Sequence, residues 1–249
     1  MSIIPRLISI YRGAGLEPLT GYNPYHFNGY RDAPFTNFLA ADNRLVGVYG
    51  LALQEVMFIE GMKDLLRPRN ILVIGNAHGW STLALALIFP RARVAALDPG
   101  EEGNGITNEL ARRHKLNVVA ATGYSPLDVP ALRQQYLTAP ADLVLIDAIH
   151  ENDAVLADFA AVSAQSQPNA VYVFHDVMNW NLEKAFLAIK TDNKLEGHIL
   201  TRTPSGMAIA WRNGSASFSD YVSAFTEDPG LYQSLRNFYV PPTDAGRTG

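Results

Sequence analysis

Cysteine is absent from the 249-residue chain, which excludes disulfide bridges, thiolate metal sites and a cysteine nucleophile. Charge is sparse: 20 basic and 24 acidic side chains give a formal net charge of -4. Because the basic residues are also scattered, we expect no nucleic-acid partner bound through phosphates. No apolar run approaches the roughly 18 residues of a membrane span, and the N-terminus lacks a signal-peptide layout. These absences favour a soluble cytoplasmic protein with neither a membrane nor a nucleic-acid partner.

Hydrophobic residues make up 48% of the chain, which is enough for a substantial core. Apolar runs and amphipathic stretches alternate strictly from about residue 70, as strands and helices do in a doubly wound parallel sheet. We expect strands at 71–75, 93–97, 117–121, 142–147 and 170–175, and helices at 81–89, 104–114, 128–137, 151–165 and 180–190. The pattern predicts one α/β domain with appended segments rather than two equal domains.

The end of this alternating region differs from its beginning. Two further expected strands, 198–203 and 207–212, are separated by three residues, and so short a loop joins only antiparallel neighbours. The fold class is therefore a Rossmann-like, seven-stranded α/β sheet with an antiparallel last strand. We divide the chain into an N-terminal lid segment and helix at 1–69, a core at 70–213, and a C-terminal helix and flexible tail at 214–249.

The N-terminal region carries many aromatic residues without sustained periodicity. We interpret residues 1–40 as loops and short helices that pack on the core as a lid, a hydrophobic cover or a contact of a homodimer. Apolar positions from 43 to 66 recur at intervals of three and four, which predicts an amphipathic helix with a break near Gly50.

The most informative stretch is 71–82, where a buried strand turns into a helix through Gly75 and Gly79. Asp98 ends the next expected strand, where an acidic residue meets ribose hydroxyls in nucleotide-binding folds. A dinucleotide fingerprint would have a middle glycine between Gly75 and Gly79, and a P-loop would end in Gly-Lys-Ser/Thr. The sequence has neither of these features. The pattern favours a phosphate-free adenosine cofactor. The alternatives are that both glycines are ordinary turn residues and that Asp98 only caps its own turn.

On these residues the chain resembles the class I S-adenosylmethionine-dependent methyltransferases over about 70–212. The likeness is carried by Ile-Gly-x-x-x-Gly-x-Ser-Thr at 74–82, by Asp98, and by the reversed final hairpin. The resemblance implies S-adenosylmethionine as the cofactor and a methyltransferase activity. N-methylation, a nicotinamide-dependent oxidoreductase and a non-catalytic binding member of the fold are the alternatives.

Within that class the chain is most similar to the macrocin-type small-molecule and sugar O-methyltransferases. Two strand ends carry this closer likeness: 142–150, which ends in Ile-Asp-Ala-Ile-His, and 171–177, which contains Phe-His-Asp-Val. The chain departs from the family at Ala148, where the family usually has glycine. The resemblance implies a small-molecule methyl acceptor, a sugar or a phenolic natural product, that is methylated on oxygen.

The expected site residues follow strand ends, which face the ligand crevice in this kind of fold. The cofactor-binding candidates are Gly75, Asn76, Gly79, Trp80, Ser81, Asp98, Gly123, Tyr124 and Asp147. Ser81 can also be read as a residue of the first helical turn, and Gly123 and Tyr124 as a plain turn. Asp158 is expected at the surface or as a tether between helix and strand.

The catalytic candidates are Asp147, His150 and His175, which should converge on one rim. Either histidine could remove a proton from the acceptor. The resemblance implies that Asp147 and Asp176 hold Mg²⁺, a hard ion that prefers oxygen ligands. His175 is a third metal candidate, although its nitrogen would suit a softer ion better. A metal-free site with a histidine base is the alternative.

Overall fold

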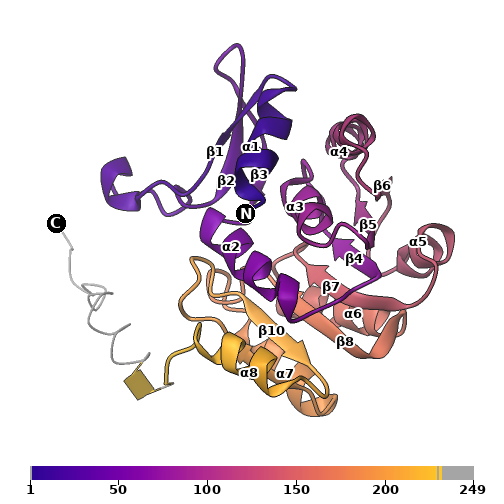
Figure 1. The fold of residues 1–249 in the computed structure, drawn as a ribbon. Coiled ribbons are helices and arrows are strands. Elements are labelled where there is room, and N and C mark those ends of the chain that lie inside the picture. The colour runs from indigo at the N-terminus through magenta and orange to yellow at the C-terminus, as the bar shows by residue number, and fades with distance from the viewer. Residues whose placement is uncertain (1, 229, 232–249) are drawn as a thin grey trace.

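The computed structural model describes residues 2–228 and 230–231, which form a large sheet with helices on both faces and a small N-terminal sheet beside α1 (Figure 1). The larger sheet has the order β6-β5-β4-β7-β8-β10-β9. Its strands are β4 (Asn70–Ile74), β5 (Arg93–Asp98), β6 (Val118–Thr122), β7 (Ala141–Ile146), β8 (Ser166–Phe174), β9 (Glu196–Ile199) and β10 (Ala208–Trp211). β10 runs antiparallel to β8 and β9, whereas β4 to β8 are parallel. The predicted seven-stranded sheet with a reversed last strand is confirmed.

Helices cover both faces of this sheet, as the alternation of strand and helix predicts. They are α1 (Ile4–Arg12), α2 (Leu53–Gly61), α3 (Trp80–Ile88), α4 (Glu101–His114), α5 (Val129–Tyr136), α6 (Asn152–Ser163), α7 (Glu183–Asp192) and α8 (Ala216–Ser223). Successive side chains of a strand point to opposite faces, so β4 contributes to two separate cores. Ile71 and Val73 belong to a cluster with residues of α1, α2, α3, α4 and α8, while Leu72 and Ile74 belong to a second cluster with residues of α5, α6 and α7.

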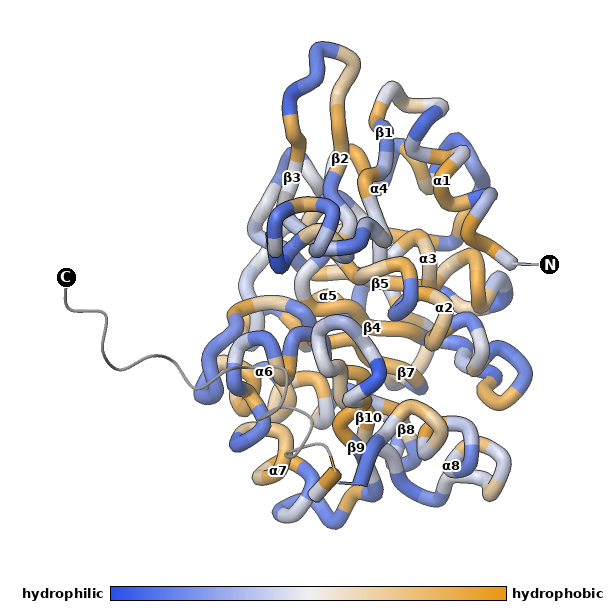
Figure 2. Tube along the Cα trace, turned by 90° about the vertical axis from the view of Figure 1, so that its left-hand side faces the viewer, coloured by the Kyte–Doolittle hydropathy of each residue, from blue (hydrophilic) through white to orange (hydrophobic). Residues whose placement is uncertain are grey.

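The central strands are buried on both faces, and Figure 2 shows β4 and β7 as hydrophobic stretches inside more polar loops. Such continuous apolar runs are typical of parallel strands that helices cover on both sides. The carboxyl ends of these strands therefore form an edge at which polar residues begin. No helix in the described part of the chain is both long and apolar enough to cross a bilayer.

The N-terminal region contains a second sheet that the sequence analysis missed. Strands β1 (Leu16–Leu19), β2 (Thr36–Ala40) and β3 (Leu45–Gly50) pair antiparallel, and a 3-10 turn (Pro24–Phe27) lies between the first two. The expected helix over 43–66 is wrong in its first part, because α2 begins only at Leu53. Val46 pairs with Phe38 across the sheet, and this partner on another strand decides the conformation, which local spacing alone could not indicate.

The remaining elements differ from expectation mainly at their ends. A second 3-10 turn (Met62–Asp64) extends α2, and β8 begins four residues before the expected start at 170. The helix expected in the 214–249 segment is α8, while the flexible tail predicted beyond it lies outside the described residues.

Candidate active site

A cavity of about 810 Å³ lies at the carboxyl ends of the parallel strands. The loops after β4, β5, β6, β7 and β8 line it, and residues between 31 and 50 of the N-terminal region form a further wall. All the expected site residues except Gly79 line this one cavity. Side chains that are separated by up to a hundred positions in the chain are thus brought together by the parallel sheet.

The loop after β4 requires its two glycines for close packing. Gly75 has φ 90°, and a Cβ built there would lie 1.8 Å from the carbonyl oxygen of Asp147. Gly79 has φ 80° and precedes α3, where a Cβ would come within 2.2 Å of the Thr107 hydroxyl. A side chain at Gly75 would push the loop away from the end of β7.

Asp98 holds the same loop from the neighbouring strand. One carboxylate oxygen accepts hydrogen bonds from the backbone N–H groups of Asn76 at 2.8 Å and Ala77 at 2.9 Å. The other oxygen accepts from the N–H of Gly100 at 2.7 Å. Asp98 therefore caps its own turn, as one interpretation of the sequence had it, and also fixes the glycine loop in front of the cavity.

The side chain of Asn76 lies inside the protein and joins two helices. Its amide nitrogen donates to Asn104 at 3.0 Å and to the Thr107 hydroxyl at 2.9 Å. Its carbonyl oxygen accepts from the Thr82 hydroxyl at 2.8 Å. The backbone of Asn76 is engaged as well, because its N–H donates to Asp98 and its carbonyl accepts from the Gly79 N–H at 2.7 Å. Trp80 and Ser81 are likewise buried in the first turn of α3.

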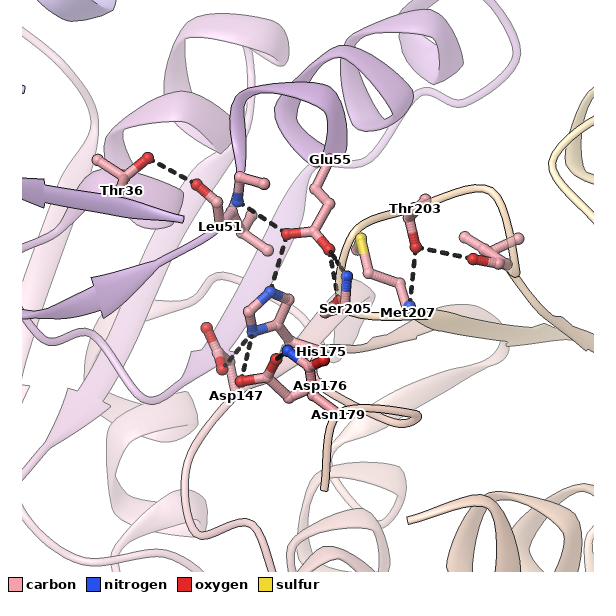
Figure 3. A network of polar contacts seen from close by, with 12 residues as sticks. Thr36, Leu51, Glu55, Asp147, His175, Asp176, Asn179, Thr203, Ser205 and Met207 are labelled. Atoms are coloured by element: carbon pink, nitrogen blue, oxygen red, sulfur yellow. Dashed lines mark hydrogen bonds and ion pairs between the residues drawn. The ribbon is translucent and has the colours of Figure 1, made fainter. Parts of the chain in front are cut away.

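His175 sits between two carboxylates at the end of β8 (Figure 3). Its Nδ1 lies 2.9 Å from Asp147 and its Nε2 lies 2.9 Å from Glu55. Burial alone would lower the pKa of His175, but the charges of Asp147 and Glu55 raise this pKa well above its usual value. Both ring nitrogens are therefore protonated and donate hydrogen bonds, so His175 has no free lone pair with which to accept a proton.

The sequence did not indicate that Glu55 belongs to this cluster. It is 0% exposed, and its carboxylate also accepts from the backbone N–H groups of Ala52 and Ser205 and from the Ser205 hydroxyl. The contact joins α2 to the end of β8 and to the β9–β10 connection (Figure 3). The only local signal is a glutamate in the first turn of a helix, which ordinarily caps that helix.

His150 is the more accessible histidine of the cluster, with 28% of its side chain exposed against 2% for His175. Its Nε2 lies 3.6 Å from Asp147 and 3.4 Å from Asp176. Its ring stacks on Trp180, with centroids 5.4 Å apart and planes 12° from parallel. The Nε2 atom itself is buried and makes no hydrogen bond to the described residues.

Asp147 connects the two histidines. Burial alone would raise its pKa, but the positive charge of His175, the hydrogen bond with His175 and the nearby His150 lower that pKa well below the usual value. The carboxylate is therefore ionised. Asp147, His175 and Asp176 each offer one ligand atom, and these three atoms lie within 4.8 Å of one another, which is close enough for a shared metal ion.

The loop after β6 forms the far end of the cavity. Tyr124 is exposed, whereas Ser125 donates a hydrogen bond from its hydroxyl to Asp158 at 2.5 Å. Asp158 lies on α6, is 4% exposed and lines the cavity. The expected surface position of Asp158 is therefore wrong, because the helix turns this side chain towards the cavity. The other expectation, that Asp158 is a tether, agrees with its hydrogen bond to Ser125.

Comparison with known proteins supports the assignment of this fold. A family model described as a methyltransferase domain matches residues 72–177. An O-methyltransferase from Bacillus cereus, solved in complex with SAH, is similar in structure with a TM-score of 0.56 and 20% sequence identity over 66% of this chain and 83% of that chain. No curated protein sequence matches the chain.

Two further solved structures are similar over about the same region. The O-methyltransferase TomG from Streptomyces achromogenes, involved in tomaymycin synthesis and solved with SAM, has a TM-score of 0.52 and 19% identity over 64% of this chain and 79% of that chain. The MycE methyltransferase of the mycinamycin pathway was solved with Mg, SAH and mycinamycin VI. It has a TM-score of 0.50 and 17% identity over 67% of this chain and 52% of that chain. The chain has the fold of the S-adenosylmethionine-dependent methyltransferases, with the sequence pattern of a methyltransferase domain over residues 72–177.

Proposed function

We propose that this protein is an S-adenosylmethionine-dependent methyltransferase that acts on an oxygen of a small molecule, a sugar or a phenolic natural product. One observation carries the proposal: the glycine loop with Asp98 and the cluster of His150, Asp147 and Asp176 line the same cavity. Methyl transfer needs a bound methyl donor beside a group that removes a proton from the acceptor. The cavity offers both within one enclosure.

The cofactor half of the proposed site is the loop after β4 together with Asp98. A carboxylate has about four acceptor positions, and three backbone N–H groups use three of those on Asp98. The remaining position can accept a ribose hydroxyl. Gly123 and Tyr124 would border the adenine, and Trp80 and Ser81 would support the loop from behind. The bound cofactor supplies an electrophilic methyl group on a positively charged sulfur.

His150 is the proposed general base. Its Nε2 would take the proton from the acceptor hydroxyl while the oxygen forms a bond to the methyl carbon, and the electron pair of the breaking carbon–sulfur bond would remain on sulfur. Asp147 and Asp176 flank the same nitrogen and stabilise the imidazolium that results. Both ring nitrogens of His175 are engaged, so we assign His175 to holding Asp147 in place rather than to proton transfer.

A divalent metal ion fits the carboxylates of this cluster. As the alternative to the metal-free site just described, we propose that Asp147 and Asp176 hold Mg²⁺, because both offer oxygen ligands. Such an ion would lower the pKa of the acceptor hydroxyl. His175 could contribute its Nδ1 only after losing the proton that it shares with Asp147, and a nitrogen ligand would favour a softer ion than Mg²⁺.

The acceptor would lie against the N-terminal wall of the cavity. Phe35 and Phe38 supply apolar surface there, and Tyr49 offers a hydroxyl. The proposal of a sugar or a phenol rests on the macrocin-type likeness of the strand ends. The presence of mycinamycin VI in the similar MycE structure is consistent with a small-molecule acceptor.

Calorimetry with S-adenosylhomocysteine and, separately, NAD⁺ tests the cofactor. We expect binding of the first and none of the second, and the reverse would contradict the proposal. Transfer of a labelled methyl group to a panel of phenols, sugars and amines then tests the acceptor, and NMR of the product shows whether oxygen or nitrogen is methylated.

The base is tested with His150→Gln. This variant should lower kcat by about 10²- to 10⁴-fold, the usual contribution of a general base, while the Kd for S-adenosylhomocysteine stays the same. His198→Gln is the matched control, because His198 is exposed and does not line the cavity. Equal kcat values for the two variants would remove His150 from the mechanism.

A further inference from the structure

The ring of His150 lacks the hydrogen bonds that fix the ring of His175. No hydrogen bond joins the His150 ring to the part of the chain that the structure describes, and its Nε2 lies 3.6 Å from Asp147 and 3.4 Å from Asp176. His175, by contrast, donates two hydrogen bonds of 2.9 Å. The torsion that turns a histidine ring about its Cβ–Cγ bond is broad, so hydrogen bonding leaves the plane of the His150 ring undetermined.

Trp180 supplies the contact that determines this plane. The centroids of the two rings lie 5.4 Å apart, their planes are 12° from parallel, and both side chains line the cavity. Aromatic rings attract each other in offset stacks of this kind, and a rotation of the imidazole about its Cβ–Cγ bond would break the parallel arrangement. The stack therefore keeps the Nε2 of His150 on the side of Asp147 and Asp176.

The backbone anchors Trp180 in this place. The N–H of Trp180 donates to the carbonyl oxygen of Asp176 at 3.1 Å. The side-chain amide of Asn152, at the start of α6, donates to the carbonyl oxygen of Asn181 at 3.2 Å. This second bond ties the loop that carries His150 to the loop that carries Trp180, so the two rings face each other across loops that are joined.

A third side chain reaches the stack from the N-terminal region. Arg31 lies in the connection between β1 and β2, lines the cavity, and places its guanidinium carbon 5.4 Å from the ring centroid of Trp180. A cation over the face of an indole is attracted by the ring. Arg31 also forms an ion pair of 3.4 Å with Asp32, which orients the guanidinium from the same connection.

We propose that Trp180 and Arg31 are positioning residues for the proposed base: Trp180 orients the His150 ring, and Arg31 steadies Trp180. The inference rests on the proposed function, because it needs His150 to remove the proton of the acceptor. A general base works within hydrogen-bond reach of that proton, and small losses of alignment slow the reaction. The N-terminal region then contributes to the chemical step as well as to the wall of the cavity.

Steady-state kinetics tests the role of Trp180, with the acceptor that the panel of phenols, sugars and amines identifies. Trp180→Ala should lower kcat by about 3- to 10-fold, the value of one aromatic pair, while the KM for the acceptor stays the same. Trp180→Phe keeps a flat ring and should retain most of the wild-type kcat. Leu187→Ala is the matched control, because Leu187 is an exposed apolar residue of α7 outside the cavity lining. A raised KM with an unchanged kcat would make Trp180 only a wall of the acceptor pocket and would overturn the proposal.

Double variants separate positioning from a structural role. In a His150→Gln background, Trp180→Ala should have no further effect on kcat, because the ring that Trp180 orients is gone. Arg31→Gln should lower the wild-type kcat by about 2- to 5-fold and have no effect in a Trp180→Ala background. Arg44→Gln is the control, since Arg44 is about as exposed as Arg31, pairs with a nearby aspartate and lies outside the cavity lining. Equal losses of kcat in every background overturn the proposal.

NMR of protein labelled at the histidine Cε1 detects the stack in solution without any acceptor. The Hε1 resonance of His150, assigned with His150→Gln, should be shifted upfield by the indole ring current, and the shift should be lost in Trp180→Ala. A protein that methylates no acceptor of the panel overturns the proposed function, and the positioning role with it. A protein that methylates one of them but shows no such shift overturns the positioning role alone.

Discussion

Removal of Glu55 should destabilise the protein more than removal of any ordinary surface charge. Its carboxylate is fully buried and accepts hydrogen bonds from Ala52, from two donors of Ser205 and from the imidazolium of His175. Glu55→Ala leaves the charge of His175 without one of its buried partners. Breaking a buried ion pair in this way typically costs about 3–5 kcal/mol of unfolding free energy.

Glu55→Gln separates the effect of the Glu55 charge from the effect of its side-chain size. The glutamine side chain is about the same size but carries one N–H₂ donor, which must replace the oxygen facing Ala52 and His175 or the oxygen facing the two donors of Ser205. One buried donor then loses its acceptor, at a cost of about 1–3 kcal/mol. Glu55→Gln should therefore fall between the wild type and Glu55→Ala.

Urea unfolding followed by circular dichroism measures these differences, with the slope m checked for constancy. Glu60→Gln is the matched control: Glu60 is on the same helix α2, and among the described residues it accepts hydrogen bonds from the Ser2 hydroxyl and the Ile3 N–H alone. The Glu60→Gln substitution should cost about 1 kcal/mol of unfolding free energy, the value for neutral donors. If Glu55→Ala is no more destabilising than Glu60→Gln, the buried network does not hold α2 to the end of β8 and the reasoning fails.

Two other predictions concern the glycine loop and Asp158. Gly103→Ala should abolish binding of S-adenosylhomocysteine in calorimetry, because its Cβ would lie 1.9 Å from the Ala77 carbonyl oxygen in the glycine loop. Gly105 has open space around it, so Gly105→Ala should bind S-adenosylhomocysteine normally and gain up to about 1 kcal/mol of stability. Equal binding of this ligand by both variants would contradict the packing argument. Burial raises the folded-state pKa of Asp158, so its contribution to stability is most favourable below its unfolded pKa of about 3.9 and is lost as the pH rises through the folded value. Asp158→Asn should thus gain stability relative to the wild type between about pH 4 and 7 in urea unfolding, and a difference independent of pH would refute this.

Much of the core could be predicted because its signals are local. The apolar run of β4, the glycines after it and Asp98 lie within thirty residues, and each is typical of one element or turn. The short connection before β10 likewise permitted only an antiparallel strand. The N-terminal sheet could not be predicted in this way, because β3 owes its conformation to pairing with β2, and its spacing of apolar residues also fits a helix.

By itself, the sequence determined the order of strands and helices from about residue 70, the glycine loop, and the presence of acids and histidines at strand ends. Hydrophobic period and turn residues act over a few positions, so these features can be read locally. Only the tertiary structure decided which histidine is accessible. His175 is enclosed because Glu55, 120 positions earlier, is brought to its Nε2 by α2, and His150 is left open beside Asp147 and Asp176. Such contacts depend on how whole elements pack, and no local pattern records them.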